Sequence, residues 1–317
     1  MHILGAGSIG CLVAAGVRGP VTLVLRNETK LLHFRQLDQT IRILGATTRT
    51  RKIEAATPSS CGDIDTLVVC TKAGDTINAL KPLVGKIGPS STVIFIQNGM
   101  GALDHISTLF PPSSSPKLIF GITANGCKPT SLAWTYQHTG SGPFVFSSPK
   151  RFTFPIESDL FPIEIVKWSD FEHLRLAKLL VNAAINPLTA IIGCPNGGIL
   201  DKNLDYIVRG LVEESCAIVN KKYHMRFKPW DILSQVYAVA EKTSTNVSSM
   251  LADVRAAKST EIDYINGFLC RTARPLGLSC VRNQFLTDMV RLKQSHSLMS
   301  DEAAVQMKQS RVFDAIP

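Results

Sequence analysis

The feature that most constrains the fold is a glycine-rich hexamer between an apolar segment and a helix-forming one. Residues 5–10 read Gly-Ala-Gly-Ser-Ile-Gly; residues 1–4 before them are apolar, and residues 11–17 after them favour a helix. Gly19-Pro20 ends that helix, and residues 21–25 are typical of a β-strand. This strand–loop–helix–strand order predicts the first unit of a parallel α/β sheet.

Each glycine of the hexamer has a predicted role in a Rossmann-type nucleotide site. Gly5 permits a tight turn, Gly7 lets the backbone approach a pyrophosphate, and Gly10 lets helix and strand pack closely. The amino terminus of the helix that follows this loop offers unbonded N–H groups and the positive end of its dipole, which attract phosphate. A plain glycine turn is the alternative, although the flanking strand and helix favour the nucleotide site.

The end of the second strand predicts which dinucleotide binds. An NAD site carries Asp or Glu about 20 residues after the first glycine, where it binds the ribose hydroxyl. This chain has Arg26 there, followed by Asn27. Because a guanidinium pairs well with phosphate, we expect the 2′-phosphate of NADPH. A solvated surface arginine is the alternative.

Further apolar runs at 66–70, 92–96 and 118–122 predict parallel strands covered on both faces. Residues 134–146 alternate around Gly140-Ser141-Gly142, which predicts an antiparallel hairpin at the sheet edge. Lys72 and Asn98 follow two of the strands, at the edge where ligands bind in such sheets. Either residue could instead belong to an ordinary turn.

After about residue 168 the pattern becomes helical, so we expect an α/β Rossmann-type domain at 1–168 and an all-helical domain at 169–317. Pro187 should kink or end the first helix. The expected helices are Leu174–Thr189, Leu204–Lys222, Trp230–Thr243 and Thr260–Arg274.

Three polar residues recur along the first of these helices. Lys178, Asn182 and Asn186 lie four residues apart, on one face of a helix that is otherwise apolar. Buried ammonium and amide groups need partners, and a polar substrate would supply them. Amides that bridge helices are the alternative.

Two later residues belong with this row. Ser249 lies in the polar segment 246–250, and Glu261 opens the last expected helix, where it shares a face with Ile265 and Phe268. A carboxylate beside Lys178 would keep the ammonium charged and oriented. An ordinary acidic residue in a first helical turn is an equal alternative for Glu261.

Composition narrows the classes of partner. The net charge of +9 comes from scattered residues without a basic run, so we expect no nucleic acid and favour an anionic small molecule. The eight cysteines form no closely spaced pair, so we expect no metal site and free thiols in a reducing compartment. With no run of 18 apolar residues and no room before the first strand for a signal peptide, we expect a soluble, cytoplasmic protein that does not bind membranes.

Taken together, these residues resemble the ketopantoate reductase (2-dehydropantoate 2-reductase) family over nearly the whole chain. The Lys-Asn-Asn-Pro helix and the Ser-Ser-Met-Leu segment are highly specific, whereas many families share the glycine loop. The resemblance rests on residues 5–10, Thr71-Lys72-Ala73, Gln97-Asn98-Gly99, residues 178–190, Cys194-Pro195-Asn196-Gly197, Ser248-Ser249-Met250-Leu251 and Thr260-Glu261-Ile262-Asp263.

The resemblance implies NADPH-dependent reduction of 2-dehydropantoate to pantoate, on the route to pantothenate and coenzyme A. It implies that Lys178 is the general acid and that Glu261 positions it. The implied substrate-binding residues are Asn98, Asn182, Asn186 and Ser249. The implied cofactor-binding residues are Gly5, Gly7, Ser8, Ile9, Gly10, Arg26, Lys72 and Asn98.

Three alternatives stay open from the sequence. One is a related NADP-dependent dehydrogenase of another small keto or hydroxy acid, which only a substrate panel would separate. Another is a non-catalytic NADPH-binding regulator. Such a regulator would be expected to have lost the lysine, asparagine and glutamate residues, whereas this chain has the complete set. A nucleic-acid-binding module would need basic or aromatic clusters that this sequence lacks. The sequence leaves a homodimer open.

Overall fold

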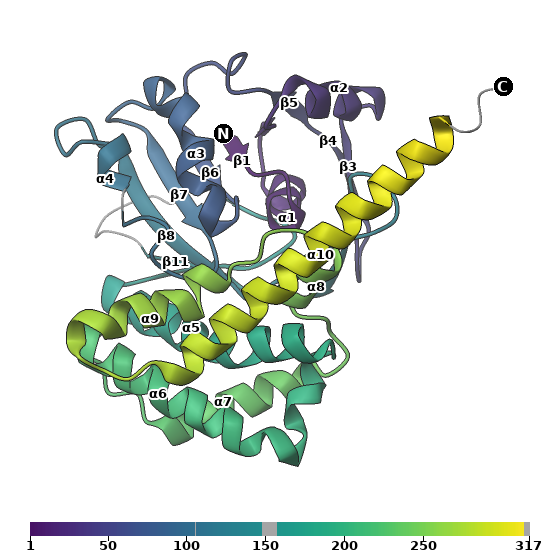
Figure 1. Ribbon diagram of the computed structural model, residues 1–317. Helices are drawn as coiled ribbons and strands as arrows, with labels where there is room; N and C mark the ends of the chain where they lie inside the picture. Colours follow the sequence, from purple (N-terminus) through teal and green to yellow (C-terminus); the bar gives the residue numbers. More distant parts are fainter. Residues whose placement is uncertain (105, 148–156, 314–317) are drawn as a thin grey trace. The chain divides into compact units, whose positions relative to one another are not determined.

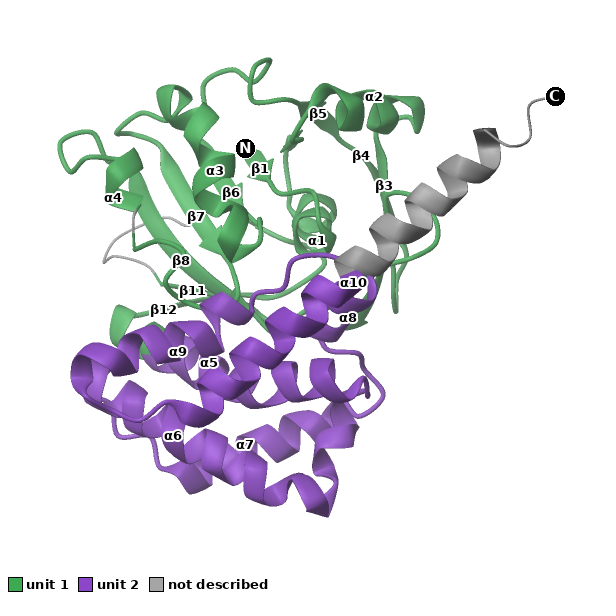
Figure 2. Ribbon diagram, viewed as in Figure 1, with its two compact units in different colours: residues 1–172 green, residues 173–317 purple. Residues whose placement is uncertain are grey.

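The computed structural model describes residues 1–104, 106–147 and 157–313, with side chains up to Ser297 (Figure 1). The chain divides into two compact units, Met1–Glu172 and His173–Pro317 (Figure 2). The first is an α/β unit and the described part of the second is helical, as the sequence predicts. The domain boundary predicted between residues 168 and 169 stays a prediction.

The first unit is built on an eight-stranded sheet with the order β12-β11-β8-β7-β6-β1-β2-β5. Every neighbouring pair is parallel except β8 and β11, which run antiparallel. The strands are β1 (His2–Leu4), β2 (Thr22–Val24), β5 (Glu54–Ala56), β6 (Thr66–Val69), β7 (Thr92–Ile96), β8 (Lys117–Thr123), β11 (Phe144–Ser147) and β12 (Ile163–Val166). The helices of this unit are α1 (Ser8–Gly16), α2 (Glu28–Gln36), α3 (Thr76–Leu80) and α4 (Ile106–Leu109), with 3₁₀ turns η1 (Ala73–Asp75) and η2 (Lys81–Lys86).

The central strands of this sheet are buried on both faces, which explains their continuous apolar runs. Successive side chains of a strand point to opposite faces, so Ile3 joins one core and Leu4 the other. Along β7, Ile94 packs with α1, whereas Val93 packs on the other side with Leu80 of α3. The apolar runs predicted as covered strands are confirmed.

A second sheet, with the order β4-β3-β10-β9, packs against α1. Its strands are β3 (Thr40–Leu44), β4 (Arg49–Lys52), β9 (Gly126–Pro129) and β10 (Thr135–Gly140). The predicted hairpin over residues 134–146 is wrong, because β10 pairs with β9 and β3 while β11 pairs with β8 and β12.

The chain crosses between the two sheets at the glycines predicted as a hairpin turn. The amide of Asn125 donates to the Gly142 carbonyl at 2.6 Å and accepts from the Gly142 N–H at 3.3 Å. Asn125 itself lies between β8 and β9, so both connections cross from one sheet to the other side by side. This anchoring at Asn125 takes the place of a tight turn.

The described part of the second unit is a group of packed helices. Helix α10 packs against α6, α8 and α9, and α6 packs against α7 and α9. The elements are α5 (Trp168–Ile192, whose first residues belong to the first unit), η3 (Asn196–Leu200), η4 (Lys202–Leu204), α6 (Asp205–Tyr223), α7 (Pro229–Lys242), α8 (Ser249–Arg255), η5 (Ile262–Tyr264), α9 (Asn266–Ala273), η6 (Arg274–Leu276) and α10 (Val281–Phe313).

Two helix predictions need correction, and one long helix was not predicted. Of the kink or end predicted at Pro187, the end is excluded, because helix α5 continues to Ile192. The helix expected over residues 260–274 is a 3₁₀ turn followed by α9, because the backbone of Ile265 between them has φ −112° and ψ −89°, outside the helical region. Helix α10 was not among the predicted helices.

Among the described helices, α5 alone has the length and apolar composition to cross a membrane. In the structure, however, 67% of its most apolar stretch is buried, as in the core helix of a folded unit.

Candidate functional site

Two glycines of the loop at residues 5–10 occupy positions where a side chain would not fit. Gly5 has φ +102°, and a Cβ there would lie 2.6 Å from the Thr71 nitrogen. A Cβ on Gly10 would lie 1.9 Å from the Gly5 carbonyl oxygen. At Gly7, by contrast, no atom lies within 4 Å of the Cβ position. Gly5 and Gly10 are thus required for packing, while Gly7 leaves its backbone open to the approach of a ligand.

The open approach at Gly7 adjoins the amino terminus of α1. Gly7 caps this helix without a side-chain hydrogen bond, and the first turn holds no acidic residue. The N–H groups of Ser8, Ile9 and Gly10 have no acceptor within the helix. Together with the positive end of the dipole, they fit an anionic group such as a pyrophosphate.

Lys72 and Asn98 lie at the same sheet edge, since β1, β6 and β7 are adjacent and parallel. The loops that carry them are bonded to each other: the Gln97 amide donates to the Thr71 carbonyl at 3.1 Å. Thr76 Oγ1 donates to the Lys72 carbonyl at 3.0 Å. Both predicted residues are half-buried, and Lys72 directly follows Thr71, whose backbone lies against Gly5 of the glycine loop.

Arg26 lies two residues beyond β2 and is exposed. Its position is fixed by the next residue, since Asn27 caps α2 by accepting from the Lys30 N–H at 3.0 Å. The following acid, Glu28, accepts a hydrogen bond from Thr57 Oγ1 at 2.7 Å. The guanidinium of Arg26 is therefore exposed at the end of β2, while the nearby carboxylate of Glu28 is hydrogen-bonded to Thr57.

Tyr136 is a residue near the glycine loop that the sequence reasoning missed. It comes from β10 of the second sheet, and its hydroxyl donates to the Ala6 carbonyl at 3.5 Å. Burial raises the pKa of Tyr136, so the phenol stays neutral. No sequence spacing links residues 6 and 136, because their contact depends on how β10, a strand of the second sheet, packs against α1.

Lys178, Asn182 and Asn186 form the polar stripe on α5, and the residues between them are apolar. Lys178 and Asn182 are half-buried and Asn186 is 7% exposed. The residues between them, 179–181 and 183–185, are buried. Between residues 178 and 186 the helix therefore presents one polar row among buried apolar side chains.

Lys178 titrates in an unusual environment. Burial lowers its pKa from the usual 10.5 to about 8, while the charge of Glu261 acts in the opposite direction. Glu261 lies immediately before η5, not on an α-helix as predicted. The structure still brings its carboxylate close enough to favour the charged ammonium.

Ser249, the first residue of α8, is exposed. Its neighbour Ser248 caps α8 by accepting from the Leu251 N–H at 3.2 Å, and its hydroxyl lies 2.7 Å from Thr189 Oγ1 of α5. This contact ties the start of α8 to the helix that carries the polar stripe. The structure thus places Ser249 and Glu261 on segments attached to α5.

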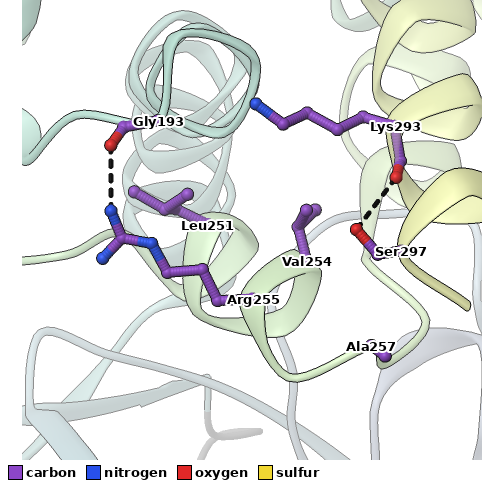
Figure 3. A pocket seen from close by; sticks show the side chains of 7 residues that line it. All are labelled: Gly193, Leu251, Val254, Arg255, Ala257, Lys293 and Ser297. Carbon is purple, nitrogen blue, oxygen red and sulfur yellow. Dashed lines mark hydrogen bonds between the residues drawn. The ribbon is translucent and has the colours of Figure 1, made fainter. Parts of the chain in front are cut away.

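A surface hollow of the second unit lies elsewhere, at the carboxyl end of α5 (Figure 3). There Arg255 donates to the Gly193 carbonyl at 2.9 Å, and Lys293 donates to the Ile191 carbonyl at 2.6 Å. Ile191 lies 13 residues after Lys178, which is about 20 Å along a helix. These two cations satisfy carbonyls at the helix end, so we do not assign the hollow to the predicted site.

Models of two known protein families match most of the chain. The model "Ketopantoate reductase PanE/ApbA" matches residues 1–151, and "Ketopantoate reductase PanE/ApbA C terminal" matches residues 170–294. The "Probable 2-dehydropantoate 2-reductase" of Schizosaccharomyces pombe is 30% identical, covering 90% of this chain and 93% of its own length.

Two comparisons involve Bacillus subtilis. Its 2-dehydropantoate 2-reductase is 32% identical, covering 90% of this chain and 94% of its own length. A crystal structure described as its probable 2-dehydropantoate 2-reductase superposes with a TM-score of 0.73 at 28% identity, covering 92% of this chain and 99% of that one. With both family models matched in order along most of its length, the chain belongs to the ketopantoate reductase family.

Proposed function

We propose that the protein reduces 2-dehydropantoate to pantoate with NADPH, on the route to pantothenate and coenzyme A. Family membership supports the reaction. The observation that carries the proposal is Lys178: a half-buried lysine with a pKa near 8, under the charge of Glu261, on a helix that also bears two asparagines. Such a lysine can give up a proton near neutral pH.

In this proposal the first unit holds the cofactor. The helix-terminal N–H groups at Ser8, Ile9 and Gly10 bind the pyrophosphate, and the open position at Gly7 admits it. Arg26 binds the 2′-phosphate, and Lys72 and Asn98 lie beside the cofactor at the neighbouring strand ends. The bound nicotinamide supplies the hydride.

Lys178 stabilises the negative charge that forms on the substrate oxygen. When hydride adds to the keto carbon, the carbonyl π electrons move to the oxygen, and a nearby ammonium stabilises this negative charge. Lys178 then gives its proton to that oxygen and regains one from solvent, so the sum is keto acid, NADPH and a proton giving hydroxy acid and NADP⁺. Glu261 keeps the ammonium charged and oriented beforehand.

The remaining polar residues hold the substrate in the proposal. The amides of Asn98, Asn182 and Asn186 can each donate and accept, so they suit the carboxylate and the hydroxyl of 2-dehydropantoate. The hydroxyl of Ser249 supplies a further donor. We further propose that residues 1–168 form the cofactor domain and residues 169–317 the substrate domain.

We also propose that the protein works in the cytoplasm as a homodimer. All eight cysteines are free thiols, which fits a reducing compartment. Sedimentation of the purified chain would test the dimer.

The test of the function follows NADPH oxidation by the purified protein with 2-dehydropantoate and with a panel of related keto acids. We expect the highest kcat/KM with 2-dehydropantoate. A clear preference for another keto acid would replace the substrate but keep the chemistry. NADPH binding without turnover of any keto acid would contradict the reductase and favour a cofactor-binding regulator.

A further inference from the structure

Helix α5 has an interruption in its hydrogen bonding beside the polar stripe. Pro187 lies inside the helix and has no N–H, so it cannot bond the carbonyl four residues earlier, at Ala183. Ala183 is only 1% exposed, so bulk water does not reach this position. A buried carbonyl in that situation needs a donor from elsewhere in the protein.

Asn266 supplies that donor. It is the first residue of α9 and is fully buried, and its Nδ2 donates to the Ala183 oxygen at 2.9 Å. The same nitrogen donates to Asn283 Oδ1, also at 2.9 Å. Both amide protons are thus committed to acceptors, and the opposite orientation would place the Asn266 oxygen against two other oxygens.

Asn266 is in turn held by Asn283, which is bonded to residues of α6. Asn283, at the start of α10, donates through Nδ2 to Glu214 Oε1 at 2.8 Å and to Ser215 Oγ at 3.1 Å. The backbone N–H of Asn283 also donates to Glu214 Oε1, at 2.9 Å. A buried chain of hydrogen bonds therefore runs from α6 through α10 and α9 to the carbonyl of α5, while the Oδ1 atom of Asn266 is buried without a hydrogen-bond partner.

We propose that Asn266 is a positioning residue for the reduction, an inference that rests on the proposed function. Ala183 directly follows Asn182 and lies between Lys178 and Asn186, so a bond there fixes the stripe where the proline would loosen it. Asn266 also begins the helix that follows Glu261 by five residues. One side chain thereby sets both the row on α5 and the segment whose carboxylate acts on Lys178.

The test is a double-mutant cycle between Asn266→Ala and Pro187→Ala. The first change removes the donor, and we expect kcat/KM for the keto acid to fall about ten- to a hundredfold with NADPH affinity unchanged, because small displacements of catalytic groups cost this much. Pro187→Ala restores an N–H at position 187, which can bond Ala183 within the helix. The double variant should therefore recover most of the loss.

The matched control is Asn220→Ala. Asn220 also satisfies backbone groups in the second unit, binding the carbonyl and N–H of Phe227 at 2.8 Å each, and neither of these described hydrogen bonds goes to α5. We expect this variant to lower the melting temperature while kcat/KM stays close to wild type. Equal loss of kcat/KM in both asparagine variants, or no recovery in the double variant, would overturn the proposal.

If Asn266→Ala alone does not fold, the comparison moves to the Pro187→Ala background. There a folded and active double variant supports the proposal, and an inactive one overturns it. Failure of the proposed function is seen separately, since it appears as absent turnover in the wild-type protein. In that case the melting temperatures of the same cycle still measure whether residues 187 and 266 are coupled.

Discussion

At the scale of single residues, the charge of Lys178 decides what the polar stripe can do. Burial holds its pKa near 8, and Glu261 keeps it from falling further. A general acid must be protonated before the reaction, so its activity is present below the pKa and lost above it.

This predicts a pH dependence with a defined sign. In the wild-type protein, kcat for keto-acid reduction should be level at lower pH and fall as the pH rises through about 8. Glu261→Gln removes the charge that raises the pKa, so the fall should move to lower pH. Glu241→Gln, a change at an exposed acid on α7, serves as control and should leave the profile in place. A profile that Glu261→Gln does not move would contradict the pairing.

Arg26 carries the second prediction at this scale. Because its guanidinium is proposed to bind the 2′-phosphate, Arg26→Ala should weaken NADPH binding by about ten- to a hundredfold, as expected for a charge-assisted hydrogen bond. NADH, which lacks that phosphate, should bind almost as before. Dissociation constants measured by fluorescence check this, with Arg35→Ala on α2 as the control for general positive charge. Equal losses for the two cofactors would exclude the contact.

At the scale of elements, the glycine loop makes opposite predictions for two of its glycines. Gly10→Ala places a methyl group 1.9 Å from the Gly5 oxygen, so the first unit should lose stability. Gly7→Ala meets no atom within 4 Å and should fold normally, yet its methyl group would stand where the pyrophosphate approaches and weaken NADPH binding.

Melting curves and NADPH titrations separate these effects. Gly85→Ala, where a Cβ also meets no atom within 4 Å, is the matched control and should change neither stability nor binding. Normal NADPH affinity in Gly7→Ala would remove the pyrophosphate from this loop.

The elements that could be predicted from the sequence are those whose own residues form an apolar run. The apolar strands around Val68 and Ile94 are covered on both faces, so the prediction of buried strands from these apolar runs is confirmed. Strand β4 reads Arg-Thr-Arg-Lys and β9 reads Gly-Cys-Lys-Pro, so neither has an apolar run. Their sheet exists only through pairing with β3 and β10, which no local pattern reveals.

The same distinction applies to the site. The four-residue spacing of Lys178, Asn182 and Asn186 predicts one helical face, because it depends on helix geometry alone. The carbonyl that Pro187 leaves without a donor within α5 is bonded by Asn266, 83 residues away from Ala183. The contact of Tyr136 with the glycine loop is likewise set by a distant strand. Tertiary bonds of this kind override the local signal of a proline or a turn.

At the scale of the whole molecule, cofactor binding should be visible as stability. A ligand that binds only the folded state adds about 2.7 kcal/mol when its concentration is 100 times its dissociation constant. NADPH should therefore raise the melting temperature of the first unit's transition in a concentration-dependent way, as followed by calorimetry. NADH at the same concentration should raise it less. A melting temperature that NADPH does not change would contradict the cofactor assignment.

The most direct test of the reductase proposal is turnover by Lys178→Ala, measured as NADPH oxidation with 2-dehydropantoate. Loss of the positioned acid should lower kcat by about 10²- to 10⁴-fold, while the dissociation constant for NADPH stays unchanged. Lys222→Ala, at an exposed lysine of α6, should behave as wild type. Near-normal kcat in Lys178→Ala would show that this lysine does not deliver the proton.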